Sequence, residues 1–147
     1  MKLKKKKTII KLINYNIYKT YLYNNGDIYE GDCFEGLKQG KGVYTYKNGD
    51  QYQGEWFQNQ KKGFGIYNYK NNDVFEGVWS DNEKNGDGTY YFNNGDRFEG
   101  FWENGVKKGK GKVFFADCSV FEGLWEENSP NGFGSLKYSN GDAFEGL

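Results

Sequence analysis

The chain repeats itself every 23 residues, and this regularity limits the folds open to it more than any other feature. Aromatic residues stand 23 residues apart at Tyr29, Tyr52, Phe75, Phe98, Phe121 and Phe144, and each is followed two residues later by glycine. Two residues further on, tryptophan recurs as Trp56, Trp79, Trp102 and Trp125, with Cys33 in this position of the first repeat. A fixed period without insertions indicates stacked copies of one supersecondary unit.

Each repeat has the pattern of a β-hairpin. Large and polar residues alternate with a period of two, which is typical of strands. Between the two halves of each repeat stand residues that tolerate the positive φ of a tight hairpin turn: Gly36, Asn59, Asn82, Gly105 and Asn128. Later in each repeat a Gly-x-Gly pair recurs, at 40/42, 63/65, 86/88, 109/111 and 132/134.

The connections between repeats carry a second turn signal. Asn-Gly-Asp occurs at 25–27, 48–50, 94–96 and 140–142, and Asn-Asn-Asp replaces it at 71–73. Residues 117–119 read Asp-Cys-Ser instead, so we expect the turn after the fourth repeat to be looser or different. Consecutive hairpins are predicted to continue one antiparallel meander.

The predicted fold is all-β: an elongated single-layer antiparallel meander of stacked 23-residue hairpins, with about eleven strands. Hydrophobic residues make up only 36% of the chain and aromatic residues 20%, which argues against a thick aliphatic core. We divide the chain into a basic, partly disordered N-terminal segment (1–19) and a repeat domain (20–147). The repeat domain comprises a half repeat (20–28), five full repeats (29–143) and the start of another (144–147).

The spacing also predicts how the rings are accommodated. If the second repeat folds about Asn59, Trp56 lies opposite Gly63, and folding the next connection places Trp79 opposite Gly65. Directly opposed residues lie about 4.5–5.5 Å apart, so an indole could lie flat only over a neighbour without a Cβ atom. The glycines are therefore predicted to be the seats of the tryptophan rings.

These residues carry a family resemblance. Aromatic-Glu-Gly-x-Trp, then Gly-x-Gly-x-aromatic, then Asn-Gly-Asp with a period of 23 resembles the MORN (membrane occupation and recognition nexus) repeat. The segment FEGFWENGVKKGKGKVFF (98–115) shows it most clearly. The resemblance implies a non-catalytic scaffold or protein-interaction module of cytoskeletal, ciliary or membrane-contact structures, often a homo-oligomer.

The composition argues against several classes of function. The chain has no histidine and only two cysteines, so histidine-based catalysis and histidine metal sites are excluded. Its net charge is zero and Arg97 is its only arginine, so nucleic-acid binding is not expected. The repeated glutamates are predicted to lie opposite the rings, roughly 9–10 Å apart, too wide for a retaining glycosidase pair. We expect no enzyme activity, catalytic residue, cofactor, metal or small-molecule substrate.

The aromatic ladder has three interpretations. Its rings could serve as core alone, or they could stack the bases of single-stranded nucleic acid. They could also form a concave groove for an extended protein partner or a second copy of the chain. The predicted partner-binding residues are Tyr52, Trp56, Phe75, Trp79, Phe98, Trp102, Phe121 and Trp125.

A lysine run at the start of the chain supports an alternative function, peripheral binding to anionic phospholipids such as phosphoinositides. The candidate lipid contacts are Lys2, Lys4, Lys5, Lys6 and Lys7, helped by loop lysines 61–62 and 107–108. A solubilising tail would have the same composition. Lys11 and Asn14 interrupt the apolar run that follows, so neither a signal peptide nor a membrane span is expected. The predicted location is the cytoplasm, with cytoskeletal or ciliary association.

Overall fold

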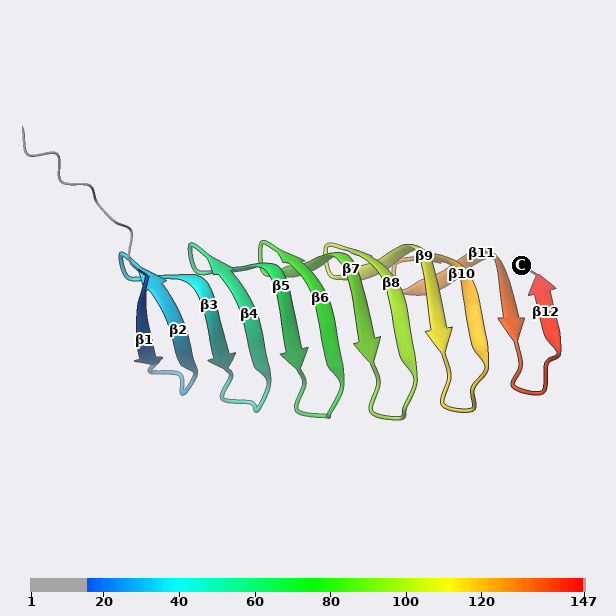
Figure 1. The fold of residues 1–147 in the computed structure, drawn as a ribbon, viewed down its shortest axis with the longest axis horizontal. Helices are drawn as coiled ribbons and strands as arrows, with labels where there is room; N and C mark the ends of the chain where they lie inside the picture. Colours follow the sequence, from blue (N-terminus) through cyan, green and yellow to red (C-terminus); the bar gives the residue numbers. More distant parts are fainter. Residues whose placement is uncertain (1–15, 147) are drawn as a thin grey trace, which may run out of the picture.

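The computed structural model describes residues 16–146, which form one open sheet of twelve antiparallel strands (Figure 1). The strand order in the sheet is the order in the sequence, so each strand pairs with the next along the chain. The predicted single-layer meander of hairpins is therefore confirmed.

Each of the five full repeats has a first strand of 7 residues and a second strand of 9 residues. β1 begins at Ile17, three residues before the predicted half repeat, and the sheet has one strand more than expected. The strands are β1 (Ile17–Leu22), β2 (Ile28–Phe34), β3 (Leu37–Thr45), β4 (Gln51–Phe57), β5 (Gln60–Asn68), β6 (Val74–Ser80), β7 (Glu83–Tyr91), β8 (Arg97–Glu103), β9 (Val106–Phe114), β10 (Val120–Glu126), β11 (Ser129–Lys137) and β12 (Ala143–Gly146).

The turn inside each repeat is the predicted tight hairpin. Gln58 and Asn59 have φ values of 47° and 70°, and both central residues of the other four hairpins are also left-handed. Two consecutive positive φ angles are typical of the type I′ turn, whose twist matches that of the flanking strands. The glycine or asparagine at this position is therefore required by the backbone.

The expectation of a different turn at 117–119 was wrong. Cys118 N donates to Phe115 O at 3.0 Å, as Gly49 N donates to Tyr46 O in an ordinary connection. Cys118 adopts a φ of 68°. Asp117 Oδ1 accepts a hydrogen bond from Ser119 N at 2.8 Å, so the local side-chain contact of the Asn-Gly-Asp turns is preserved.

The pairing of the tryptophans also differs from the prediction. Gly54 pairs with Gly65 as expected, but the register then shifts and Trp56 lies opposite Lys61 instead of Gly63. Trp79 of the next repeat faces Gly63 instead of Gly65. The reason is a bulge at Gly63, which has a φ of 74° and adds unpaired residues to one side of the hairpin.

The glycines do form seats, but their occupants are not the tryptophans. Tyr52 lies over both Gly54 and Gly65: a Cβ atom added to either glycine would stand 2.7 Å or 2.6 Å from Tyr52 Cζ. Trp56 and Trp79 pack against this ring nearly edge-on, each with a centroid distance of 5.2 Å. We call the seated side chains the inner rings: Tyr29, Tyr52, Phe75, Phe98 and Phe121.

We expect Gly65→Ala to lower the free energy of unfolding by about 1–3 kcal/mol or more, because its Cβ would collide with the Tyr52 ring. Gly105→Asn is the control, since Asn82 and Asn128 already occupy the same turn position with positive φ. Urea unfolding of both variants checks this. Equal stability of Gly65→Ala and the unchanged protein would contradict the seat.

Candidate partner-binding surface

The eight predicted partner-binding residues lie together on one face of the sheet, and the structure places them beneath its surface. Tyr52, Phe75 and Phe98 are fully buried, and the four tryptophans are 3–7% exposed. Phe121 is partly buried and packs against this cluster. A partner on this face therefore meets the side chains that cover these rings.

The covering side chains include a second aromatic row. We call its members the rim rings, one from each connection between repeats: Tyr23, Tyr46, Tyr69, Phe92, Phe115 and Tyr138. All are partly or largely exposed, from the intermediate Tyr46 to Tyr138 at 45%. Tyr67 lies between two rim rings, with its centroid 5.8 Å from that of Tyr46 and 4.5 Å from that of Tyr69. Similar contacts continue through Tyr90 to Phe92, so the band is continuous from Tyr23 to Phe92 and is interrupted where Val113 replaces the next tyrosine.

A row of lysines fills the space between the rings, a placement that the sequence analysis did not anticipate, although it named Lys61 and Lys107 as loop lysines. The Lys61 ammonium lies 4.8–5.3 Å from four ring centroids, those of Tyr46, Tyr52, Tyr67 and Trp79. The same position in the other repeats gives the set that we call the caged lysines: Lys38, Lys61, Lys84 and Lys107. Their spacing of 23 residues was the signal that could have revealed them.

Each cage combines two opposing effects. Burial lowers the pKa of both Lys61 and Lys84 to about 8, because it removes water from the ammonium group. The ring faces favour the charged form, by about 0.5–2 kcal/mol for a cation over an aromatic face. The lysine side chains therefore fill the space between the rings, and contact with the ring faces partly offsets the free-energy cost of burying their charge.

Backbone contacts from the next repeat hold each lysine in place. Lys61 N donates to Asn82 Oδ1 at 2.9 Å, and Asn82 N donates to Lys61 O at 3.3 Å. Asn59 and Asn128 make the same pair of contacts with Lys38 and Lys107. The hairpin asparagine thus serves both its own turn and the preceding repeat.

The aspartate of each Asn-Gly-Asp turn forms a second link between repeats. Asp50 accepts a hydrogen bond from the Tyr67 hydroxyl at 2.9 Å and another from Lys70 N at 2.9 Å. Tyr44 and Tyr90 donate in the same way, at 2.8 Å, to the aspartates before them. Burial, followed by the hydrogen bond to Asp50, raises the pKa of Tyr67, so it stays a neutral donor.

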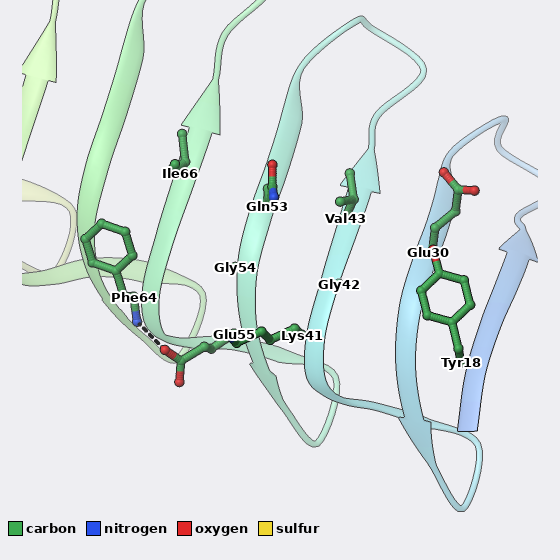
Figure 2. A pocket seen from close by; sticks show the side chains of 10 residues that line it. All are labelled: Tyr18, Glu30, Lys41, Gly42, Val43, Gln53, Gly54, Glu55, Phe64 and Ile66. Atoms are coloured by element: carbon green, nitrogen blue, oxygen red, sulfur yellow. Dashed lines mark hydrogen bonds between the residues drawn. The ribbon is translucent and has the colours of Figure 1, made fainter. Parts of the chain in front are cut away.

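The opposite face carries the glutamates, as predicted, together with apolar side chains. An open hollow of about 370 Å³ lies there between Tyr18 and Phe64 (Figure 2). Figure 2 shows Glu30 and Glu55 at different ends of this hollow, and the dashed line marks the 3.4 Å contact from Phe64 N to Glu55. The two carboxylates are not brought together as a catalytic pair.

Some of the candidate lipid contacts lie within the described residues and others do not. Lys2, Lys4, Lys5, Lys6 and Lys7 lie outside the described residues. Of the loop lysines, Lys61 is buried among rings, Lys107 lies over the Phe98 ring at 4.6 Å, and Lys108 pairs with Glu103. Lys62 is exposed, with its ammonium 4.9 Å from the Phe57 ring centroid, so the lipid alternative depends on the N-terminal run and on Lys62. Residues 16–146 contain no helix with the length and apolar character needed to cross a bilayer.

Twelve strands, identical turns and a repeated ring seat define a β-hairpin repeat protein. The chain belongs to the MORN repeat family, whose model matches residues 29–51, 52–74, 75–97, 98–117 and 121–143. This confirms the resemblance that the sequence carries. A search of curated proteins found no match to the chain.

Solved structures share the fold at low sequence identity. The TCP domain of Drosophila melanogaster SAS-4, in complex with a proline-rich motif of Ana2, has a TM-score of 0.59 and 18% identity, covering 88% of this chain and 71% of that one. The TCP10c domain of Sas-4 from the same organism has a TM-score of 0.56, also with 18% identity, covering 88% and 78% respectively. At this identity the likeness concerns the fold alone.

We expect the stability of the protein to rise between about pH 8 and pH 10. A lysine whose pKa is lowered on folding loses its proton in the folded protein before it does so in the unfolded chain, and folding then avoids burying a charge. Above about pH 10 the unfolded tyrosines ionise while buried Tyr52, with its raised pKa, does not, and stability falls.

Thermal unfolding across this range tests the expectation. The double variant Lys61→Met plus Lys84→Met should unfold at a temperature that changes less between pH 8 and pH 10. The same slope in the variant and the unchanged protein would show that these two lysines do not cause the rise.

Proposed function

We propose that the chain is a non-catalytic scaffold that binds an extended, proline-rich segment of another protein along its rim rings. The observation that carries the proposal is the partly exposed band of rings on one face of the sheet, continuous from Tyr23 to Phe92. The inner rings hold the sheet together, while the rim rings remain available for contact.

The spacing of the rim rings supports an extended occupant. Successive rim rings belong to connections two strands apart, about 9.6 Å at the usual strand separation. A polyproline II helix has three residues per turn and rises about 3.1 Å per residue, so its side chains recur about every 9.3 Å. A segment with proline at every third position could therefore place one proline near each rim ring.

The comparisons support the same occupant. The SAS-4 TCP domain, which shares the fold, was crystallised with a proline-rich motif of Ana2. The MORN repeats are in keeping with a scaffold of cytoskeletal structures.

A fluorescently labelled peptide with proline at every third position, titrated into the protein, tests the proposal. We expect saturable binding that Tyr46→Ala plus Tyr69→Ala weakens tenfold or more, because each ring supplies stacking of about 0.5–1.5 kcal/mol beyond its buried area. Fluorescence anisotropy measures the affinity.

The matched control removes two exposed rings from the other face, Phe64→Ala plus Phe101→Ala. These are 55% and 42% exposed, and we expect them to leave peptide affinity unchanged. If the peptide fails to bind, or if both pairs of substitutions weaken it equally, the rim rings are not the binding surface for such a segment.

A further inference from the structure

The aromatic face contains one cavity that its own repeat pattern does not fill. Its volume is about 490 Å³, and it is lined by residues of the third, fourth and fifth repeats. At two positions lining this cavity, the side chain differs from the one at the same position of the preceding repeats. Val113 stands where the three preceding repeats have tyrosine, and Pro130 stands where all four have a caged lysine.

The surroundings of Tyr90 show what the missing tyrosine would contact. The Tyr90 ring packs against Tyr69, Phe92 and Trp102, with centroid distances of 5.7, 4.7 and 6.2 Å. The Lys84 ammonium lies 4.9 Å above it, and its hydroxyl donates to Asp73 at 2.8 Å.

The same five contacts, moved by one repeat, are the walls of the cavity. The counterparts 23 residues further on are Phe92, Phe115, Trp125, Lys107 and Asp96, and all five line it. Val113 itself is 9% exposed and lies at the base of this space. The cavity therefore has the neighbours of a tyrosine side chain without the side chain.

Asp96 provides a polar end to the cavity. Its Oδ1 accepts from Ala116 N at 2.9 Å, and its Oδ2 accepts from Asn94 Nδ2 at 2.9 Å. In the preceding repeats the corresponding Oδ2 accepts a tyrosine hydroxyl as well. Among the described residues no hydroxyl takes this place at Asp96, so one lone-pair site of a carboxylate faces the cavity.

The next repeat differs in an instructive way. There Leu136 replaces the tyrosine, and Ser119 replaces the aspartate that would bind it. Donor and acceptor are lost together. Among the turn aspartates whose tyrosine position lies within the described residues, only Asp96 keeps the acceptor without its donor, next to an aromatic hollow.

We propose that this cavity is a binding site for a phenol, namely the side chain of a tyrosine in a bound protein segment. The ring would lie against Phe92, Phe115 and Trp125, and the hydroxyl would donate to Asp96 Oδ2. The space left by Pro130 would accommodate the residues that flank the tyrosine. The inference deepens the proposed function by adding a specific anchor to the surface beside the rim rings.

The side chain alone can be tested with p-cresol, titrated into the full chain and followed by NMR at the amides of residues 92–96 and 113–116. We expect saturable binding at least about tenfold tighter than that of toluene, which fills the same space without a hydroxyl. Asp96→Asn should reduce this preference to about threefold or less, because a neutral amide oxygen is the weaker acceptor.

Val113→Tyr is the filling variant. It should raise the unfolding temperature, since it restores the side chain of the other repeats, and abolish p-cresol binding. Leu124→Tyr, which adds a tyrosine to the exposed opposite face of the same region, should leave p-cresol binding unchanged.

Three results would overturn the proposal: no saturable binding of p-cresol, equal binding of p-cresol and toluene, or undiminished binding in a folded Val113→Tyr variant. The toluene and Asp96→Asn comparisons do not depend on the folding of that variant. These tests contain no proline-rich peptide, so failure of the phenol site is distinguishable from failure of the rim rings.

Discussion

The contact between an aromatic ring and the bare backbone of two paired glycines is the interaction on which the rest of the structure depends. A single-layer sheet has no second layer to cover it, so its own side chains must lie flat across it. Tyr52 does this over Gly54 and Gly65, and full burial of the ring follows. Two glycines cost about 0.5–1 kcal/mol each, while a buried aromatic of 150–250 Å² gains several kcal/mol at about 25 cal/mol/Å².

This contact stabilises one repeat, and polar links then join each repeat to the next. Asp50 binds Tyr67 and Lys70 in the following connection, and Asn82 binds the backbone of Lys61 in the preceding hairpin. Because these contacts cross repeat boundaries, a repeat is completed only by its neighbours. The face that a partner would meet therefore combines rings, caged ammonium groups and hydrogen-bonded carboxylates. Its specificity depends on which of these groups lack a partner within the sheet.

The sequence was sufficient for the strand order, the type I′ turns and the sharing of one face by the rings, because a period of two and left-handed glycine or asparagine positions determine these directly. It was not sufficient for the register beyond Gly54. Counting equal numbers of residues on both strands cannot anticipate the bulge at Gly63, so the tryptophans were assigned to the wrong seats. The position of the caged lysines among the rings was not predicted. It depends on the register shift at the bulge, which places Lys61 opposite Trp56.

Repetition also changes what a departure from pattern means. In an ordinary domain, Val113 would be an unremarkable core residue, but here three other repeats show which side chain the site is built for. Cys118 departs from the turn pattern without consequence, because the backbone keeps its geometry. Ser119 and Leu136 depart as a pair and leave no unmatched group. Asp96 keeps its acceptor where Val113 has replaced the donor, and a partly exposed carboxylate beside an apolar hollow gains most from a donor that also brings a ring. The chemistry of the missing side chain thus specifies the chemistry of the ligand.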